Sequence, residues 1–353
     1  MGQDPSFVPN DLGQSSDSSD HDLTIEDAAI IESIERGLRS HWSRDVTVDA
    51  LRREVHRHAT SFHVERLSVL ANGRWTGMIL KDLHTAHQVR RARFLPRSER
   101  MSAFRELILY RDLFNGRDFG VPVLYGHRWD PAAGQYWLIL EEAGQWSLEE
   151  IHNPDLCLWA AKWVARLHAA VADPPPSVRP HLYEFDAAHY LRCAERIEAK
   201  LEVFTPSERE VIEAGLDRYR ASIPALTALP RSLIHGEFYE CNLVARDRSD
   251  DHPLAVIDWE SAAYGPSYLD IASLTAESWS AEEKLATRRA YFEEYCGLLG
   301  VGLDWDYFVA SLSCLELHQA LWWLGWWSDL PHFSRYVGWL LRPIESALAA
   351  SPK

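Results

Sequence analysis

Apolar and polar residues alternate in short runs along the first part of the chain, a pattern typical of β-strands that bury one face. The run SFHVERLSVL (61–70) is followed by Asn-Gly-Arg and then by TGMILKDL (76–83), which predicts a β-hairpin. Two further strand-like runs, VPVLYG (121–126) and QYWLILEEA (135–143), flank a turn rich in proline, alanine and glycine. These patterns predict a small β-rich region.

Helical spacing of apolar residues appears around and after these strands. Within the first part of the chain it covers 24–42 and 98–114. Beyond Gly144 it dominates, because 156–172 reads as one helix, 183–225 as two, and 280–350 as helical to the end. The second part of the chain therefore predicts a larger, mainly helical region.

The composition of the first 22 residues differs from that of the remainder. Residues 1–22 are rich in serine and aspartate and cannot bury enough apolar surface to offset the entropy lost on ordering. We expect a disordered acidic tail over 1–22, an amino-terminal lobe over 23–142 and a carboxy-terminal lobe over 143–353. The predicted fold class is α+β, with a small β-rich lobe and a larger α-helical lobe.

The charge and the cysteines exclude several classes of protein. The formal net charge is -16, whereas a general nucleic-acid binder carries a basic surface, so we expect no nucleic-acid partner. The five cysteines are scattered and form no CxxC pair, so their spacing indicates neither a disulfide framework nor a zinc site. No apolar run approaches the ~20 residues of a membrane span and no leader is recognisable, so we expect a cytoplasmic protein without a membrane partner.

One constellation of polar residues points to chemistry. Within SLIHGEFYECNLVAR (232–246), an apolar run ends in a histidine, a glycine and an acid; NLVAR (242–246) and LAVIDW (254–259) then read as two strands around a polar turn. A turn centred on Asp250 would bring Asn242 and Asp258 to the same rung, where an amide oxygen and a carboxylate suit Mg²⁺. Glu237 stands just upstream. An acid beside a metal pair is what phosphoryl transfer from a nucleotide requires.

The stretch HGEFYECN followed by VIDWESAAYGPSYLD resembles the aminoglycoside phosphotransferase and choline kinase-like superfamily, with its His-Gly-Asp, Asn and Ile-Asp pattern. The resemblance spans roughly residues 45–345 and implies a bilobal protein-kinase-like fold that phosphorylates small-molecule hydroxyls. It implies that Glu237, where the family has aspartate, is the catalytic residue. It also implies that Asn242 and Asp258 are the metal ligands, with His235 and Asp270 structural.

The resemblance also implies a nucleotide site in the amino-terminal lobe. Lys81 would contact the phosphates and Glu106, on the following helix, would be its ion-pair partner. The segment LILEEAG (138–144) would hold adenine, with contacts at Glu141, Glu142 and Ala143. The loop HRHATSFHV (56–64) contains no glycine, so Ser61 and its backbone neighbours would cap a phosphate instead. The implied cofactors are ATP, with GTP as the alternative, and Mg²⁺.

The function that follows is an ATP-dependent O-phosphotransferase. Its partner is a small-molecule hydroxyl acceptor: an antibiotic such as an aminoglycoside or a nucleoside, a sugar, or an amino alcohol. The rival hypothesis is a catalytically weak or inactive kinase-like nucleotide-binding protein. Glu237 motivates it, because one added methylene moves the carboxylate by about an ångström, and such a misplacement can cost ~10²-fold in rate.

Two further features leave alternatives open. The tryptophans in LHQALWWLGWWSDL (317–330) are spaced to put 322/326 and 323/327 on adjoining helix faces, as core or as an aromatic wall of the acceptor pocket.

A protein-kinase function is disfavoured, because the stretch from Asp258 to Asp270 leaves no room for a long activation segment.

Overall fold

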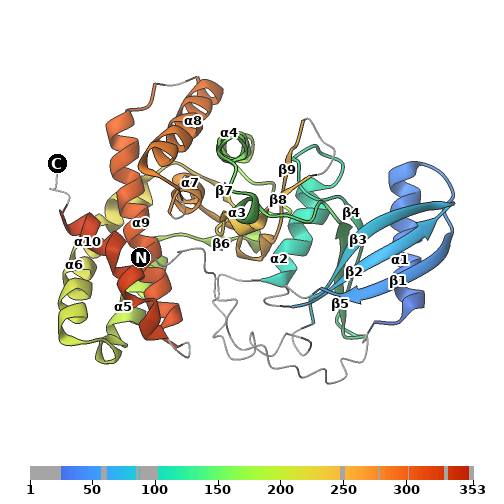
Figure 1. Cartoon of the computed structure of the whole chain (residues 1–353), viewed down its shortest axis with the longest axis horizontal. Helices are drawn as coiled ribbons and strands as arrows, with labels where there is room; N and C mark the ends of the chain where they lie inside the picture. The colour runs from blue at the N-terminus through green and yellow to red at the C-terminus, as the bar shows by residue number, and fades with distance from the viewer. Residues whose placement is uncertain are drawn as a thin grey trace. The chain divides into compact units, whose positions relative to one another are not determined.

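The structure is a computed structural model that describes residues 25–56, 62–84, 87, 102–246, 251–276, 279–300, 302–329 and 333–349. The chain divides into two compact units (Figure 1). The first comprises Met1–Phe94, Phe114–Gln145 and Ala245–Val256; the second comprises Leu95–Leu113, Trp146–Val244 and Ile257–Lys353. The chain therefore passes between units several times, whereas the predicted lobes are continuous and meet once, at 142/143. The tail predicted over 1–22 lies outside the described residues.

The first unit is built on a five-stranded antiparallel sheet in the order β1-β2-β3-β5-β4. Its strands are β1 (Val48–Val55), β2 (His63–Ala71), β3 (Arg74–Asp82), β4 (Leu124–Asp130) and β5 (Gln135–Glu141). The predicted hairpin is confirmed: Asn72 and Gly73 both have positive φ, the backbone that a two-residue turn between twisted strands requires. Strand β1 was not foreseen, because charged residues fill half of its eight positions and its apolar residues do not alternate.

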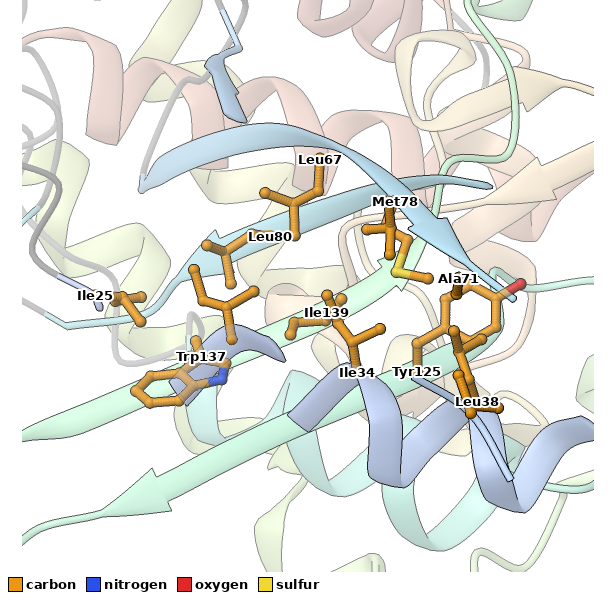
Figure 2. Close-up of a cluster of buried hydrophobic side chains, with 13 residues drawn as sticks. Ile25, Ile34, Leu38, Leu67, Ala71, Met78, Leu80, Tyr125, Trp137 and Ile139 are labelled. Atoms are coloured by element: carbon orange, nitrogen blue, oxygen red, sulfur yellow. The ribbon is translucent and has the colours of Figure 1, made fainter. Parts of the chain in front are cut away.

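Helix α1 (Asp27–Trp42) covers one face of this sheet (Figure 2). Its apolar stripe packs against inward-facing residues of the strands, among them Leu67, Met78 and Ile139. The helix approaches β4 closely, because a Cβ on Gly37 would lie 1.4 Å from the Tyr125 carbonyl oxygen. Each fully buried aliphatic side chain in such a core contributes roughly 1.5–3 kcal/mol to stability.

The second unit is mainly helical. Its longer helices begin at side chains that accept from backbone amides, as at Asn153, Thr205 and Ser280, so local sequence sets where they start. The helices are α2 (Ala103–Ile108), which runs into a π-helical turn at Leu109–Phe114, α3 (Leu148–Ile151), α4 (Pro154–Ala170), α5 (Ala187–Glu198), α6 (Pro206–Ala228), α7 (Tyr268–Leu274), α8 (Ala281–Leu299), α9 (Trp305–Trp327) and α10 (Val337–Ala349). The α+β fold class is confirmed. Among the described residues, no helix combines the length and the apolar character needed to cross a membrane.

Short strands position the polar segments of this unit. Strand β10 (Ala263–Pro266) lies between β6 (Tyr183–Glu184) and β7 (Arg231–Ile234), with Ala263 opposite Ile234 at the end of β7. Strands β8 (Leu243–Ala245) and β9 (Leu254–Val256) pair in a separate two-stranded sheet, of which β9 and Ala245 belong to the first unit. The segments that follow β7 and β9 are those that carry the sequence-predicted site.

A buried ion pair ties two strands of the first unit together. The Arg53 guanidinium on β1 donates through Nε (2.6 Å) and Nη2 (2.8 Å) to the Glu65 carboxylate on β2, and the two side chains are 6% and 2% exposed. Burial disfavours the Glu65 carboxylate, but hydrogen bonds from His63 and Arg53 and the Arg53 charge outweigh it, so the pKa of Glu65 lies below its usual value. Removing Glu65 would leave the buried Arg53 guanidinium to the exposed Asp27 carboxylate, whose Oδ1 lies 2.8 Å from Nη1.

We predict that Glu65→Gln lowers the free energy of unfolding by about 3 kcal/mol at pH 7. A carboxyl whose pKa is depressed by folding stabilises the protein above the pKa of the unfolded chain, and this contribution is lost as the pH falls through the folded pKa. The difference from the wild type should therefore shrink below about pH 4 in urea unfolding curves.

The matched control is Glu32→Gln, which removes an exposed ion pair with Arg36 on α1. It should leave the unfolding free energy almost unchanged both at pH 7 and below about pH 4. Equal losses in the two variants, or a loss in Glu65→Gln that does not depend on pH, would contradict the assignment.

Candidate active site

The chain turns sharply where β7 ends. His235 follows the strand, and Gly236 has φ +84°, a backbone conformation that glycine adopts without steric cost. The turn is held by Asp270 on α7, whose two carboxylate oxygens accept from the amides of His235 (2.7 Å) and Gly236 (2.9 Å). One carboxylate therefore satisfies the His235 and Gly236 amides as the chain leaves β7. Glu237 is the next residue.

Asp270 is itself fixed by a buried network. His168 on α4 places Nε2 3.0 Å from the Asp270 carboxylate and Nδ1 2.9 Å from the Tyr291 hydroxyl, and His168 and Asp270 are fully buried. Burial opposes ionisation of Asp270, but the hydrogen bond and charge of His168, the charge of His235 and the Gly236 amide outweigh it and lower the pKa of this carboxyl. The structural roles expected for His235 and Asp270 agree with this network.

A hydrogen bond from Ser261 fixes the Glu237 carboxylate. Ser261 Oγ donates to its Oε2 at 2.8 Å, and Ser261 is buried. The Glu237 carbonyl accepts from the Tyr239 amide (2.8 Å) and from Asn242 Nδ2 (2.9 Å), so the backbone beside the carboxylate is also fixed. Sequence reasoning missed Ser261; its signal was a hydroxyl three residues after Asp258, on the segment that joins β9 to β10.

The register expected for Asn242 and Asp258 is wrong by one residue. The Ile257 amide donates to the Asn242 carbonyl at 3.0 Å, so Asn242 lies opposite Ile257. Asn242 ends a short 3₁₀ turn, and Asp258 leaves the strand with φ +65° and ψ +65°, a left-handed conformation. An aspartate tolerates this conformation better than most residues do, but it is uncommon and typical of constrained sites.

Negative charge nevertheless gathers at this point. Burial, followed by the charges of Glu149, Glu237 and Asp258, raises the pKa of the Cys241 thiol to about 12, so these carboxylates act electrostatically on the residue next to Asn242. The Asn242 amide donates through Nδ2 to the Glu237 carbonyl, so Oδ1 is the atom it can offer to a cation. Carboxylate and amide oxygens are the ligands that Mg²⁺ prefers, so the donor set fits that ion.

Helix α2 is attached to the same segment. The Ser102 amide (2.9 Å) and the Arg105 guanidinium (2.8 Å) both donate to the carbonyl of Glu260, which lies between Asp258 and Ser261 in sequence. Helix α2 carries Glu106, which is buried. Lys81 is on β3 in the first unit, so the ion pair of Lys81 with Glu106 stays a prediction. Ser61 lies outside the described residues.

The predicted adenine contacts begin at Glu141, the last residue of β5. The Glu141 amide donates to Val123 and the Glu142 amide to Gly77, so both amides serve the sheet. The Glu141 carboxylate is ion-paired with Arg246 at 2.6 Å. Within the described chain the Ala143 amide makes no hydrogen bond, and it is the donor in this stretch best able to serve a base.

The tryptophans of α9 contact one another through their rings. The predicted pairs are present, with ring centroids 5.2 Å apart for Trp322–Trp326 and 6.0 Å for Trp323–Trp327. Trp323, Trp327 and Trp339 on α10 form a near-parallel set, here called the indole stack, with interplanar angles of 17° to 22°. Tyr239, two residues after Glu237, lies 5.7 Å from Trp323. Sequence reasoning foresaw neither Trp339 as a member of the indole stack nor Tyr239 as its neighbour.

Comparison with known proteins adds a family. The model of the phosphotransferase enzyme family matches residues 70–308, more than half of the chain. No curated protein matches in sequence.

Solved structures share the fold at low sequence identity. One is a thermostable mutant of an aminoglycoside phosphotransferase in a ternary complex with ADP and hygromycin B (TM-score 0.56, 15% identity, covering 90% of this chain and 99% of that one). Another is choline kinase from Cryptosporidium parvum (0.57, 12%, 84% and 89%). A third is macrolide 2′-phosphotransferase from Brachybacterium faecium (0.51, 18%, 92% and 99%). The chain has a kinase-like fold and belongs to the phosphotransferase enzyme family.

Proposed function

We propose that this chain transfers the γ-phosphoryl group of ATP to a hydroxyl of a small molecule, with Glu237 as the catalytic base. The observation that carries the proposal is the placement of the Glu237 carboxylate. Its Oε2 is held by Ser261 Oγ at 2.8 Å, and Asp258 lies three residues before Ser261 on the same segment. The proposed base is thereby tied to the short segment that carries the proposed metal ligand, an arrangement that suits in-line phosphoryl transfer.

The residues of this site have distinct roles in the proposed reaction. Glu237 would orient the acceptor hydroxyl and take its proton through Oε1, because Oε2 is engaged by Ser261. Asn242 and Asp258 would bind Mg²⁺. When bound, this ion would supply positive charge against the charge that develops on the phosphates. The hydrogen bond from Asn242 Nδ2 to the Glu237 carbonyl links the metal ligand to the base.

The residues proposed for the nucleotide follow the resemblance. Lys81, with Glu106 as its ion-pair partner, would contact the phosphates, and Ser61 would cap a phosphate. Glu141, Glu142 and Ala143 would border the base, and Ala143 supplies the amide donor. GTP is the alternative nucleotide, and competition between ATP and GTP in a binding titration separates the two.

The acceptor is proposed to rest on the indole stack. Flat, half-buried indole faces bind the apolar face of a sugar ring or an organic cation, so the surface beside Tyr239 suits an aminoglycoside, a sugar-bearing antibiotic or an amino alcohol. The structural relatives differ among themselves, since their names include an aminoglycoside, a macrolide and a choline enzyme. The acceptor is therefore to be found by screening hydroxylated metabolites and antibiotics for coupled ADP release.

We predict that Glu237→Gln lowers kcat by about 10²–10⁴-fold, because glutamine keeps the volume and accepts from Ser261 but cannot take a proton. Asp258→Ala should abolish turnover by removing a metal ligand. Both are measured by coupled ADP release with the best acceptor, with ATP binding followed by calorimetry. Glu293→Gln, an exposed change on α8, should behave as the wild type. Full activity in Glu237→Gln would reject that residue as the base, and wild-type ATP binding without turnover of any acceptor would favour the inactive-kinase hypothesis.

We predict that Trp323→Ala raises the KM for the acceptor by about 10-fold and leaves the KM for ATP unchanged, because the loss of one stacking face weakens binding by roughly 1.4 kcal/mol. Steady-state kinetics with each substrate varied in turn provide the measurement. The control is Trp75→Ala, which removes an indole that is 47% exposed on β3. It should change neither the KM for the acceptor nor the KM for ATP. An unchanged acceptor KM in Trp323→Ala would place the acceptor elsewhere.

A further inference from the structure

Three side chains with metal-binding atoms meet inside the helical unit, apart from the residues discussed so far. His189 and Cys193 lie one turn apart on α5, a spacing that puts both on one face of the helix, and His318 comes from α9. One ring nitrogen from each histidine and the Cys193 sulfur lie within 4.8 Å of one another. All three residues are buried, with 1%, 4% and 1% exposed.

Each histidine is oriented by a tyrosine hydroxyl. Tyr183 Oη lies 3.0 Å from His189 Nδ1, and Tyr219 Oη lies 2.7 Å from His318 Nδ1. A histidine that binds a metal through one ring nitrogen normally engages its other nitrogen in such a hydrogen bond, which fixes both the tautomer and the direction of the ring. The two hydroxyls therefore direct both histidines to coordinate through Nε2.

The distance between donors matches a tetrahedral ion. His189 Nε2 lies 3.8 Å from Cys193 Sγ. Zinc bonds of about 2.3 Å to sulfur and about 2.0–2.1 Å to nitrogen, at a tetrahedral angle, separate the two ligand atoms by about 3.6 Å. The helix face therefore presents sulfur and nitrogen at nearly the spacing that one zinc ion requires, before any side chain moves.

The surroundings select a soft ion over Mg²⁺. Two imidazoles and a thiolate favour Zn²⁺, whereas Mg²⁺ requires oxygen ligands. No carboxylate joins this group among the residues that the structure describes. The shell is aromatic: Phe185 lies 4.2 Å from His189 and Tyr190 lies 5.1 Å from His318 between ring centroids. Such a shell limits the access of water to a bound ion and so slows its exchange.

We propose that His189, Cys193 and His318 bind one Zn²⁺ ion that links α5 to α9. Binding releases the Cys193 proton to solvent, and the thiolate offsets one of the two positive charges. The ion would fix α9, the helix that also carries Trp323 and Trp327. The zinc site stands without the proposed reaction, because it shares no residue with Glu237, Asn242 or Asp258.

The first test measures the metal on the full-length wild type. The purified chain is incubated with ZnCl₂, passed over a desalting column and assayed for zinc by mass spectrometry, with about one ion expected per chain. Substitution with Co²⁺ should give a thiolate-to-cobalt charge-transfer band in the near ultraviolet, and excess Mg²⁺ should not displace the ion. A wild type that retains no zinc, or that binds Co²⁺ without this band, overturns the proposal.

The second test assigns the ligands. Cys193→Ala and His318→Gln should each lose the retained zinc, and Cys193→Ala should lose the cobalt band. Zinc should raise the Tm of the wild type and not that of the two variants. The control is Cys157→Ala, which removes another buried thiol, on α4, and should retain the ion and the Tm rise. Stoichiometric zinc in Cys193→Ala would show that the ion lies elsewhere and would overturn the proposal; a variant that fails to fold leaves the wild-type cobalt band as the deciding result.

Discussion

The site depends on one buried carboxylate. Asp270 is fully buried, and it accepts from two consecutive backbone amides as the chain leaves β7 and from His168 on α4. A buried charge without partners costs several kcal/mol, a large share of the 5–15 kcal/mol by which a folded domain is stable. The arrangement that presents Glu237 is therefore also one that the helical unit needs in order to fold. Geometry at the site and stability of the unit share the same hydrogen bonds.

Sequence reasoning reached those parts of the structure that depend on local patterns. Alternation and an Asn-Gly turn predicted the hairpin of β2 and β3, because both signals lie within a few residues of each other. Strand β1 was missed, because tertiary pairing with β2 determines it and its own pattern does not.

Parts that depend on backbone conformation or on distant residues were beyond that reasoning. The register of Asn242 and Asp258 was wrong by one, because a 3₁₀ turn precedes β8 and a left-handed residue follows β9. Neither feature has a signal in hydrophobic alternation. Ser261 contacts Glu237 because β10, which follows Ser261, pairs with β7, which precedes Glu237; sequence reasoning did not predict this pairing. The cluster of His189, Cys193 and His318 joins helices far apart in the chain, so counting cysteine spacings gave no zinc site.

The segment between β9 and β10 answers the question that Glu237 raises. A glutamate in place of aspartate extends the carboxylate by about an ångström, which by itself would misplace a base. Here Ser261 holds one carboxylate oxygen, and Ser261 belongs to the same short turn that begins at Asp258. The Ser102 amide and the Arg105 guanidinium of helix α2 donate two hydrogen bonds to the Glu260 carbonyl in that turn, so α2 also fixes its backbone. The proposed base and the proposed metal ligand are thus positioned by one piece of backbone. A longer side chain is compatible with this arrangement, because Ser261 determines where its carboxylate stops.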